Sequence, residues 1–157
     1  MKFYHQSNRY TAGEKVKEFE RKWSQWQECK YSVFVNSGSS ANLILINALK
    51  ELYQWKGNSK IIVPAITWST NIAPVIQNNL KPIFVDVNLN NLSFDINILK
   101  NELEKHKNVV GIFITHLLGI PSQVEEIKEL CKGKDIKIFE DCCESHGAVI
   151  NGKKVGN

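Results

Sequence analysis

The chain has 157 residues, of which 43% are hydrophobic and 23% are charged, and its formal net charge is +4. This length and composition suit one globular domain with its own apolar core. They exclude membrane-spanning segments, because no stretch approaches the roughly 20 consecutive apolar residues that a span needs. The residues from Met1 to Tyr10 also lack the apolar core of a secretory signal, so we expect a cytoplasmic protein.

The basic residues are scattered along the chain, with acidic residues between most of them. A nucleic-acid site would need clustered lysine or arginine, so this distribution indicates a solvated surface and no nucleic-acid partner. The cysteines are Cys29, Cys131, Cys142 and Cys143, and they form no C-x-x-C pair. We therefore expect reduced thiols and no metal site.

Five short apolar runs alternate with amphipathic segments, which is typical of a parallel sheet covered on both faces. We predict that each run forms a buried strand. The runs are 31–35, 60–63, 82–85, 109–114 and 136–139.

Helical periodicity lies before and between these runs. Before the first run, Phe19, Trp23 and Trp26 recur on one helical face, and apolar residues with the same period continue over 41–52. A further helix is predicted over 95–106.

The last helix has start and stop signals in the sequence. Ser122 and Glu125 stand in the S-x-x-E arrangement of a capping box, and Gly133 is placed to end the helix. The sequence therefore predicts a helix between these residues.

The order of these elements predicts a doubly wound α/β fold, with a mostly parallel sheet and helices on both faces. No repeat or linker interrupts the chain, so we expect residues 1–157 to belong to a single domain. The stretch 147–155 contains Asn151-Gly152 and is typical of a hairpin, but its second strand has barely begun where the sequence stops. We expect the domain to be partial.

Ligands of doubly wound proteins bind beyond the carboxyl ends of the strands, and the first such segment is 36–42. It reads Asn-Ser-Gly-Ser-Ser-Ala-Asn and leads into a helix. Gly38, Ser39 and Ser40 would let a single phosphate approach free N–H groups and the positive end of the helix dipole. The alternative is a plain N-cap.

The second segment follows the run 60–63. Trp68 lies there among small polar residues, where its ring could stack on a flat ligand. The alternative is a tryptophan of the core, packed under the loop.

The third segment follows the run 136–139 and contains Glu140 and Asp141. Adjacent residues of a strand point to opposite sides, so we expect at least one of these acids to face the ligand edge. A protonated ring nitrogen would be a suitable cationic partner. The alternatives are capping of a neighbouring helix and pairing with a lysine.

In combination, the three segments resemble the DegT/DnrJ/StrS family of sugar aminotransferases, which are fold-type I enzymes dependent on pyridoxal phosphate (PLP). The resemblance extends from about residue 10 to residue 156 and includes 82–87, 116–121 and 152–156. It implies that this chain is part of the large, cofactor-binding domain and that a small C-terminal domain is absent.

The resemblance also implies roles for individual residues. Asp141 would hold the ring nitrogen, Trp68 would stack on the ring, and Glu144 would lie near the ring hydroxyl. Glu144 departs from the glutamine of the aminotransferases and from the aspartate of the related sugar 3-dehydrases. The phosphate would be held by Gly38, Ser39 and Ser40, while structural roles are favoured for His116 and His146.

The activity implied is transfer of an amino group, from a donor such as glutamate, to a keto group of a nucleotide-linked sugar, for cell-surface polysaccharide or deoxyaminosugar synthesis. The family's Schiff-base residue is expected beyond Asn157, and a homodimer is expected. One alternative is a sugar 3-dehydrase, which the string 36–42 and Cys142-Cys143 followed by an acid resemble closely. Another is a catalytically incomplete fragment that only binds the cofactor.

Overall fold

The computed structural model describes residue 9 and residues 11–157. The chain divides into two compact units, the first formed by residues 1–36 with residue 157 and the second by residues 37–156. No helix in the described part of the chain is long and apolar enough to cross a membrane.

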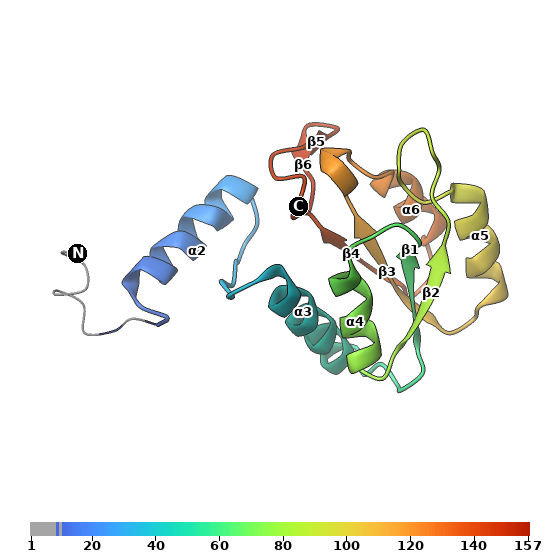
Figure 1. Cartoon of the computed structure of the whole chain (residues 1–157), viewed down its shortest axis with the longest axis horizontal. Helices are drawn as coiled ribbons and strands as arrows, with labels where there is room; N and C mark the ends of the chain where they lie inside the picture. Colours follow the sequence, from blue (N-terminus) through green and yellow to red (C-terminus); the bar gives the residue numbers. More distant parts are fainter. Residues whose placement is uncertain (1–8, 10) are drawn as a thin grey trace. The chain divides into compact units, whose positions relative to one another are not determined.

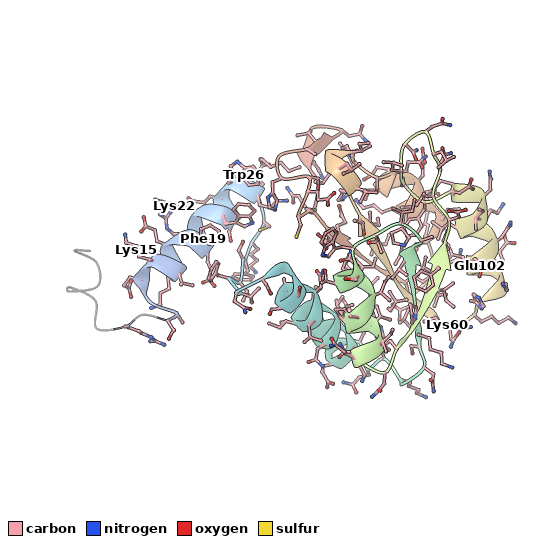
Figure 2. All side chains as sticks on the ribbon, in the orientation of Figure 1. Lys15, Phe19, Lys22, Trp26, Lys60 and Glu102 are labelled. Atoms are coloured by element: carbon pink, nitrogen blue, oxygen red, sulfur yellow. The ribbon has the colours of Figure 1, made fainter. Side chains whose placement is uncertain are left out.

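The first unit contains helix α2 (Glu14–Gln27), which follows the predicted periodicity and ends where Glu28 adopts a left-handed conformation. On one side of the helix, the rings of Phe19 and Trp23 stack with their centroids 5.7 Å apart. Elsewhere on α2, Lys15 and Lys22 both pair with Glu18, at 3.1 and 2.8 Å (Figure 2). Hydrogen bonds from these two lysines hold the pKa of Glu18 at about 2.

The expected strand over 31–35 is wrong. This segment has no regular secondary structure, and its Tyr31 and Val33 side chains are largely exposed. Its Phe34 N–H donates to the Glu20 carboxylate of α2 at 2.8 Å rather than to a neighbouring strand. An apolar run becomes a strand only where another strand satisfies its backbone groups, and the described chain provides none here.

The second unit is built on a four-stranded sheet in the order β2-β1-β3-β4, and all its neighbouring strands are parallel (Figure 1). The strands are β1 (Lys60–Pro64), β2 (Lys81–Val85), β3 (Val109–Thr115) and β4 (Lys137–Asp141). The four predicted runs agree with them within two residues at each end. Because β2 lies on one side of β1 and β3 on the other, the winding direction reverses between β1 and β3.

Helices cover both faces of this sheet, as predicted (Figure 1). On one face, apolar residues of α3 and α4 pack against Ile61, Val63 and Phe113 of the strands. On the other face, residues of α5 and α6 pack against Ile62 and Ile112. The helices are α3 (Gly38–Leu52), α4 (Ser69–Gln77), α5 (Ile96–Lys105) and α6 (Val124–Leu130).

Helix α4 was not predicted from the sequence, because it contains Pro74 and its first turn consists of small polar residues. Proline is unfavourable inside a helix, since it lacks the N–H that would bond to the carbonyl four residues earlier. Burial overrides this preference: Asn71, Pro74 and Val75 are all buried.

The predicted capping box at α6 is also wrong. The helix begins at Val124, and its N-cap Gln123 forms no side-chain capping bond. The Ser122 hydroxyl donates instead to the carbonyl oxygen of Thr115 at 2.8 Å. Ser122 therefore connects the end of β3 to the following loop rather than capping a helix.

The predicted hairpin is present. Strands β5 (Val149–Ile150) and β6 (Lys153–Lys154) pair antiparallel, and Asn151 and Gly152 both have positive φ, 50° and 79°. Two positive φ angles at the centre of a two-residue loop are what a type I′ turn requires.

Gly111 of β3 gives a test of the sheet packing. A Cβ atom at this position would lie 2.9 Å from both Ile61 Cδ1 and Phe139 Cε1, so Gly111→Ala should lower the free energy of unfolding by about 1–3 kcal/mol. Urea unfolding measures this change. The control Gly57→Ala, where the nearest atom is 4.0 Å away, should change it by less than about 0.5 kcal/mol; equal effects of the two variants would contradict this packing.

Candidate functional site

A cavity of about 270 Å³ lies at the carboxyl ends of β3 and β4, beside the first turns of α3 and α4. Thr115 and Asp141, the last residues of these two strands, are register partners and both face it. The cavity is lined by Gly38, Ser39, Trp68, Thr70, Thr115, His116, Leu117, Asp141, Cys143 and Glu144. It therefore occupies the edge of the sheet where the sequence predicted a ligand site.

The structure brings five of the six predicted site residues together at this cavity, and Ser40 is the exception. The Ser40 N–H donates to Ser37 Oγ at 3.2 Å, and the two hydroxyl groups are also 3.2 Å apart. Ser37 is thus the N-cap of α3, and Ser40 takes part in the cap.

The first turn of α3 is suited to an anion. The N–H groups of Gly38 and Ser39 have no carbonyl partner within the helix, and the positive end of its dipole lies there. A Cβ atom on Gly38 would lie 3.2 Å from the Cys143 sulfur, so a larger residue would crowd the wall of the cavity. Both features fit the predicted phosphate position.

Trp68 is the N-cap residue of α4 and its side chain is 66% exposed. The alternative interpretation, a tryptophan buried under the loop, is therefore wrong. The indole borders the cavity and offers a flat apolar surface there.

The carboxylate of Asp141 is held at both oxygens. Oδ1 accepts a hydrogen bond from the Cys143 N–H at 3.0 Å, and Oδ2 accepts one from Asn42 Nδ2 at 3.1 Å. The neighbouring Glu140 bonds to different groups, the His116 ring and the Gly156 N–H. The two adjacent acids thus have separate partners, and only Asp141 lines the cavity.

Behind Asp141 lies a polar network that the sequence analysis missed. Asn71 donates to Thr67 Oγ1 at 3.0 Å and to Thr115 Oγ1 at 2.9 Å, and the two hydroxyl oxygens are 2.7 Å apart. Its carbonyl oxygen accepts from Asn42 at 2.9 Å. The available signal was the position of these polar residues, which stand in or beside the segments that follow the strands.

Glu144 contacts the loop that follows β3. Its carboxylate accepts the Leu118 N–H at 2.6 Å, and Leu118 has a positive φ of 54°. Non-glycine residues adopt this conformation at a cost in free energy, so Glu144 stabilises a strained turn at the cavity wall.

His116 is fully buried, is hydrogen-bonded at both ring nitrogens and also lines the cavity, so the structural role that the sequence favoured stays a prediction. Its Nδ1 accepts the Ser122 N–H at 3.0 Å, so the ring proton is on Nε2, which lies 2.7 Å from the Glu140 carboxylate. Burial raises the pKa of Glu140, but hydrogen bonds from His116 and the Gly156 N–H outweigh it and hold this pKa below its ordinary value. His146 is exposed and does not line the cavity.

Possible ligand atoms of His116, Glu140 and Cys142 lie within 4.8 Å of one another. In this structure His116 Nε2 forms a hydrogen bond with Glu140 at 2.7 Å. Burial raises the pKa of the neighbouring Cys142 thiol to about 12. The contact that the structure shows within this cluster is therefore the hydrogen bond between His116 and Glu140.

All four cysteines are free thiols, as predicted. Burial and the neighbouring Asp141 raise the pKa of Cys143, at the cavity wall, to about 11. A thiol with such a pKa is protonated near neutral pH and is a weak nucleophile.

Residues 2–157 match the DegT/DnrJ/EryC1/StrS aminotransferase family. The chain belongs to this family. The resemblance recognised in the sequence is therefore confirmed, and so is the fold, which matches solved structures of fold-type I enzymes.

Two curated relatives represent two reactions within the DegT/DnrJ/EryC1/StrS family. The chain is 42% identical over 153 residues to a GDP-4-keto-6-deoxy-D-mannose 3-dehydratase of Yersinia pseudotuberculosis, covering 96% of the chain and 38% of the relative. It is 32% identical over 152 residues to a dTDP-3-amino-3,6-dideoxy-alpha-D-galactopyranose transaminase of Aneurinibacillus thermoaerophilus, covering 97% and 40%.

The chain is also similar to a solved structure. The E. coli GDP-4-keto-6-deoxy-D-mannose-3-dehydratase with bound hydrated PLP superposes with a TM-score of 0.88 at 40% identity, covering 94% of this chain and 38% of that one. The chain thus spans about two fifths of the length of the relatives that it matches.

The contact between His116 and Glu140 predicts a pH dependence of stability. Because the pKa of Glu140 is lower in the folded protein than its ordinary value of 4.5, its ionised form stabilises the fold above pH 4.5, and this stabilisation is lost as the pH falls through the lowered pKa. Glu140→Gln should therefore reduce the loss of unfolding free energy between about pH 5 and about pH 3, measured by urea unfolding. Glu125→Gln, at an exposed ion pair, is the control; the same acid dependence in wild type and Glu140→Gln would exclude this coupling.

Proposed function

We propose that the protein carrying this chain uses PLP to modify a nucleotide-linked keto sugar. The observation that carries the proposal is the cavity at the carboxyl ends of β3 and β4, which combines the first turn of α3, the exposed Trp68 ring and the oriented Asp141 carboxylate.

The residues of the cavity fit the parts of PLP. The phosphate would bind to the N–H groups of Gly38 and Ser39 and to the Ser39 hydroxyl, as anions do at helix N-termini. The aromatic ring would lie against Trp68, and its nitrogen would face Asp141. The absence of a side chain on Gly38 keeps this end of the cavity open toward Cys143.

When bound, PLP supplies an electron sink for bonds that break beside the substrate amine. Asp141 serves this chemistry by keeping the proton on the ring nitrogen, since a nearby carboxylate favours the charged form of a pyridine. Glu144 holds the strained turn at Leu118, and we propose that it thereby keeps the wall beside the ring hydroxyl in place.

For the reaction itself, we favour removal of a ring hydroxyl by a 3-dehydratase. The 42% identity to the Yersinia enzyme supports this choice. So do the string 36–42 and Cys142-Cys143 with the following acid, which resemble the dehydrase branch.

The second candidate is transamination of the keto group with a donor such as glutamate. Its support is the 32% identity to the Aneurinibacillus transaminase. In both cases we place the residue that acts on the PLP aldehyde, the small C-terminal domain and the residues that select the sugar outside this chain. We further propose that the protein is a cytoplasmic homodimer, as the family resemblance implies.

Cofactor uptake tests the proposal. Full-length protein should take up PLP, which the absorbance of the bound cofactor and quenching of tryptophan fluorescence should report. Trp68→Ala should weaken PLP binding about 3- to 10-fold, because ring stacking contributes about 0.5–1.5 kcal/mol. Trp26→Ala, an exposed tryptophan of the other unit, is the control. Absence of PLP uptake by the full-length protein would contradict the proposal.

The product distinguishes the two reactions. With GDP-4-keto-6-deoxymannose, PLP and glutamate, the full-length protein should yield a nucleotide sugar that has lost the hydroxyl at carbon 3, identified by mass spectrometry. A product carrying an amino group in place of the keto oxygen would instead support transamination. If neither product forms from GDP- or dTDP-linked 4-keto sugars, both reactions are excluded.

A further inference from the structure

The side-chain amide of Asn42 is surrounded by hydrogen-bond acceptors. Asn42 lies in the first turns of α3 and is buried, with only 7% of its surface exposed. Its Nδ2 lies 2.9 Å from Asn71 Oδ1, 3.1 Å from Asp141 Oδ2 and 3.4 Å from the Thr70 carbonyl oxygen. The nitrogen of the amide must therefore face this cluster, since its oxygen would meet acceptors only.

Asn71, which is fully buried, fixes this orientation from the other side. Its side-chain nitrogen donates to the hydroxyl groups of Thr67 and Thr115. Its oxygen is consequently the atom presented to Asn42. Reversing either amide would place two donors or two acceptors against each other in a buried site, which is expensive in free energy.

Pro74 accounts for the availability of one of the acceptors, the Thr70 carbonyl oxygen. The carbonyl of Thr70 would normally accept the N–H of residue 74 in the helix, but proline has no N–H to give. Asn42 Nδ2 donates to this oxygen at 3.4 Å instead. The irregularity of α4 thus adds to the set of groups that hold Asn42.

We propose that Asn42 is a positioning residue that aims the Asp141 carboxylate into the cavity, and that Thr67, Thr115 and Asn71 hold Asn42 as its donor. The inference rests on the proposed function in taking the group that faces Asp141 to be the ring nitrogen of PLP. With Asn42 on Oδ2 and the Cys143 N–H on Oδ1, the carboxylate is fixed in one orientation before any ligand binds. Pre-organisation of this kind improves binding because the side chain has less freedom to lose.

The same two helices contain a matched control. At the other end of the α3–α4 contact, Asn47 Nδ2 donates to Asn78 Oδ1 at 3.0 Å, close to the 2.9 Å of the pair Asn42 and Asn71. Neither Asn47 nor Asn78 lines the cavity or bonds to Asp141. Asn47→Ala therefore removes an equivalent contact between the helices without removing a donor from the site, and Asn78→Ala removes that contact together with the bond from Asn78 Nδ2 to the Pro74 carbonyl at 2.8 Å.

The first experiment measures PLP binding to the full-length protein. Asn42→Ala should bind PLP about tenfold more weakly, the loss expected for one hydrogen bond to a charged group, and Asn71→Ala should also bind it more weakly. Asn47→Ala and Asn78→Ala should bind it as wild type does. Equal affinities in all four variants and wild type would overturn the inference while leaving the proposed function intact.

A pH titration distinguishes the orientation of Asp141 by Asn42 from a general effect of Asn42 on folding stability. With Asp141 no longer held, the ring nitrogen of bound PLP should lose its proton at lower pH in Asn42→Ala than in wild type or Asn47→Ala, as a shift in the absorbance titration. A variant that is only less stable would keep the wild-type titration, and that result would count against the inference.

A second readout needs no cofactor. In urea unfolding, the destabilisations caused by Asn42→Ala and Asp141→Ala should fail to add in the double variant, whereas those of Asn47→Ala and Asp141→Ala should add. Additive losses for Asn42 and Asp141 would overturn the inference even if PLP binds. If PLP does not bind, the proposed function fails, and this cycle still decides whether Asn42 holds Asp141.

Discussion

The parallel pairing of β1, β3 and β4 is the constraint on which the site depends. Parallel strands all end at the same edge of the sheet, so Thr115 and Asp141 come to lie side by side as register partners. The winding direction also reverses between β1 and β3, which separates the helices that follow these strands and leaves space at this edge. The cavity is a consequence of the topology, and the side chains only give it its chemistry.

In the unit formed by residues 37–156, the apolar core and the hydrogen-bonded polar groups lie in different places. The strand interiors contribute Ile, Val and Phe side chains to clusters on both faces of the sheet. Apolar contacts of this kind do not require a particular orientation of the groups. At the carboxyl edge, buried amides and hydroxyls such as Asn71 and Thr115 have few possible partners. Because buried polar groups must be satisfied, each of them fixes the next, and the network ends at Asp141.

Much of this could be predicted from the sequence. Four of the five apolar runs are strands, because a run of such residues is stable where both faces of a sheet are covered. The run 31–35 has a similar composition but no neighbouring strand among residue 9 and residues 11–157, and composition alone does not reveal a missing partner. Trp68 and Asp141 were recognisable because they stand just after the apolar runs 60–63 and 136–139, whereas Gly38 was located after the run 31–35, which is not a strand, and its position is instead explained by the first turn of α3.

The contact between Asn42 and Asn71 could not be foreseen in this way. The two residues are 29 positions apart and meet only because α3 and α4 pack side by side on one face, while α4 itself was hidden by Pro74 and its polar first turn. In the same way, the hydroxyl of Ser122 could serve a helix cap or a strand end equally well by sequence, and the position of Thr115 decides between them.

Pro74 also links the backbone of one helix to the side chain of another. In an ordinary helix every interior carbonyl is used by the helix itself, and neighbouring groups cannot borrow it. Here the oxygen of Thr70 is released four residues upstream and is used by Asn42. A residue with an N–H at position 74 would compete with Asn42 for the Thr70 oxygen. Position 74 therefore influences the hydrogen bonds of Asn42, although it does not line the cavity. The missing hydrogen bond within α4 is thus replaced by a hydrogen bond between the two helices, from Asn42 of α3 to the Thr70 carbonyl of α4.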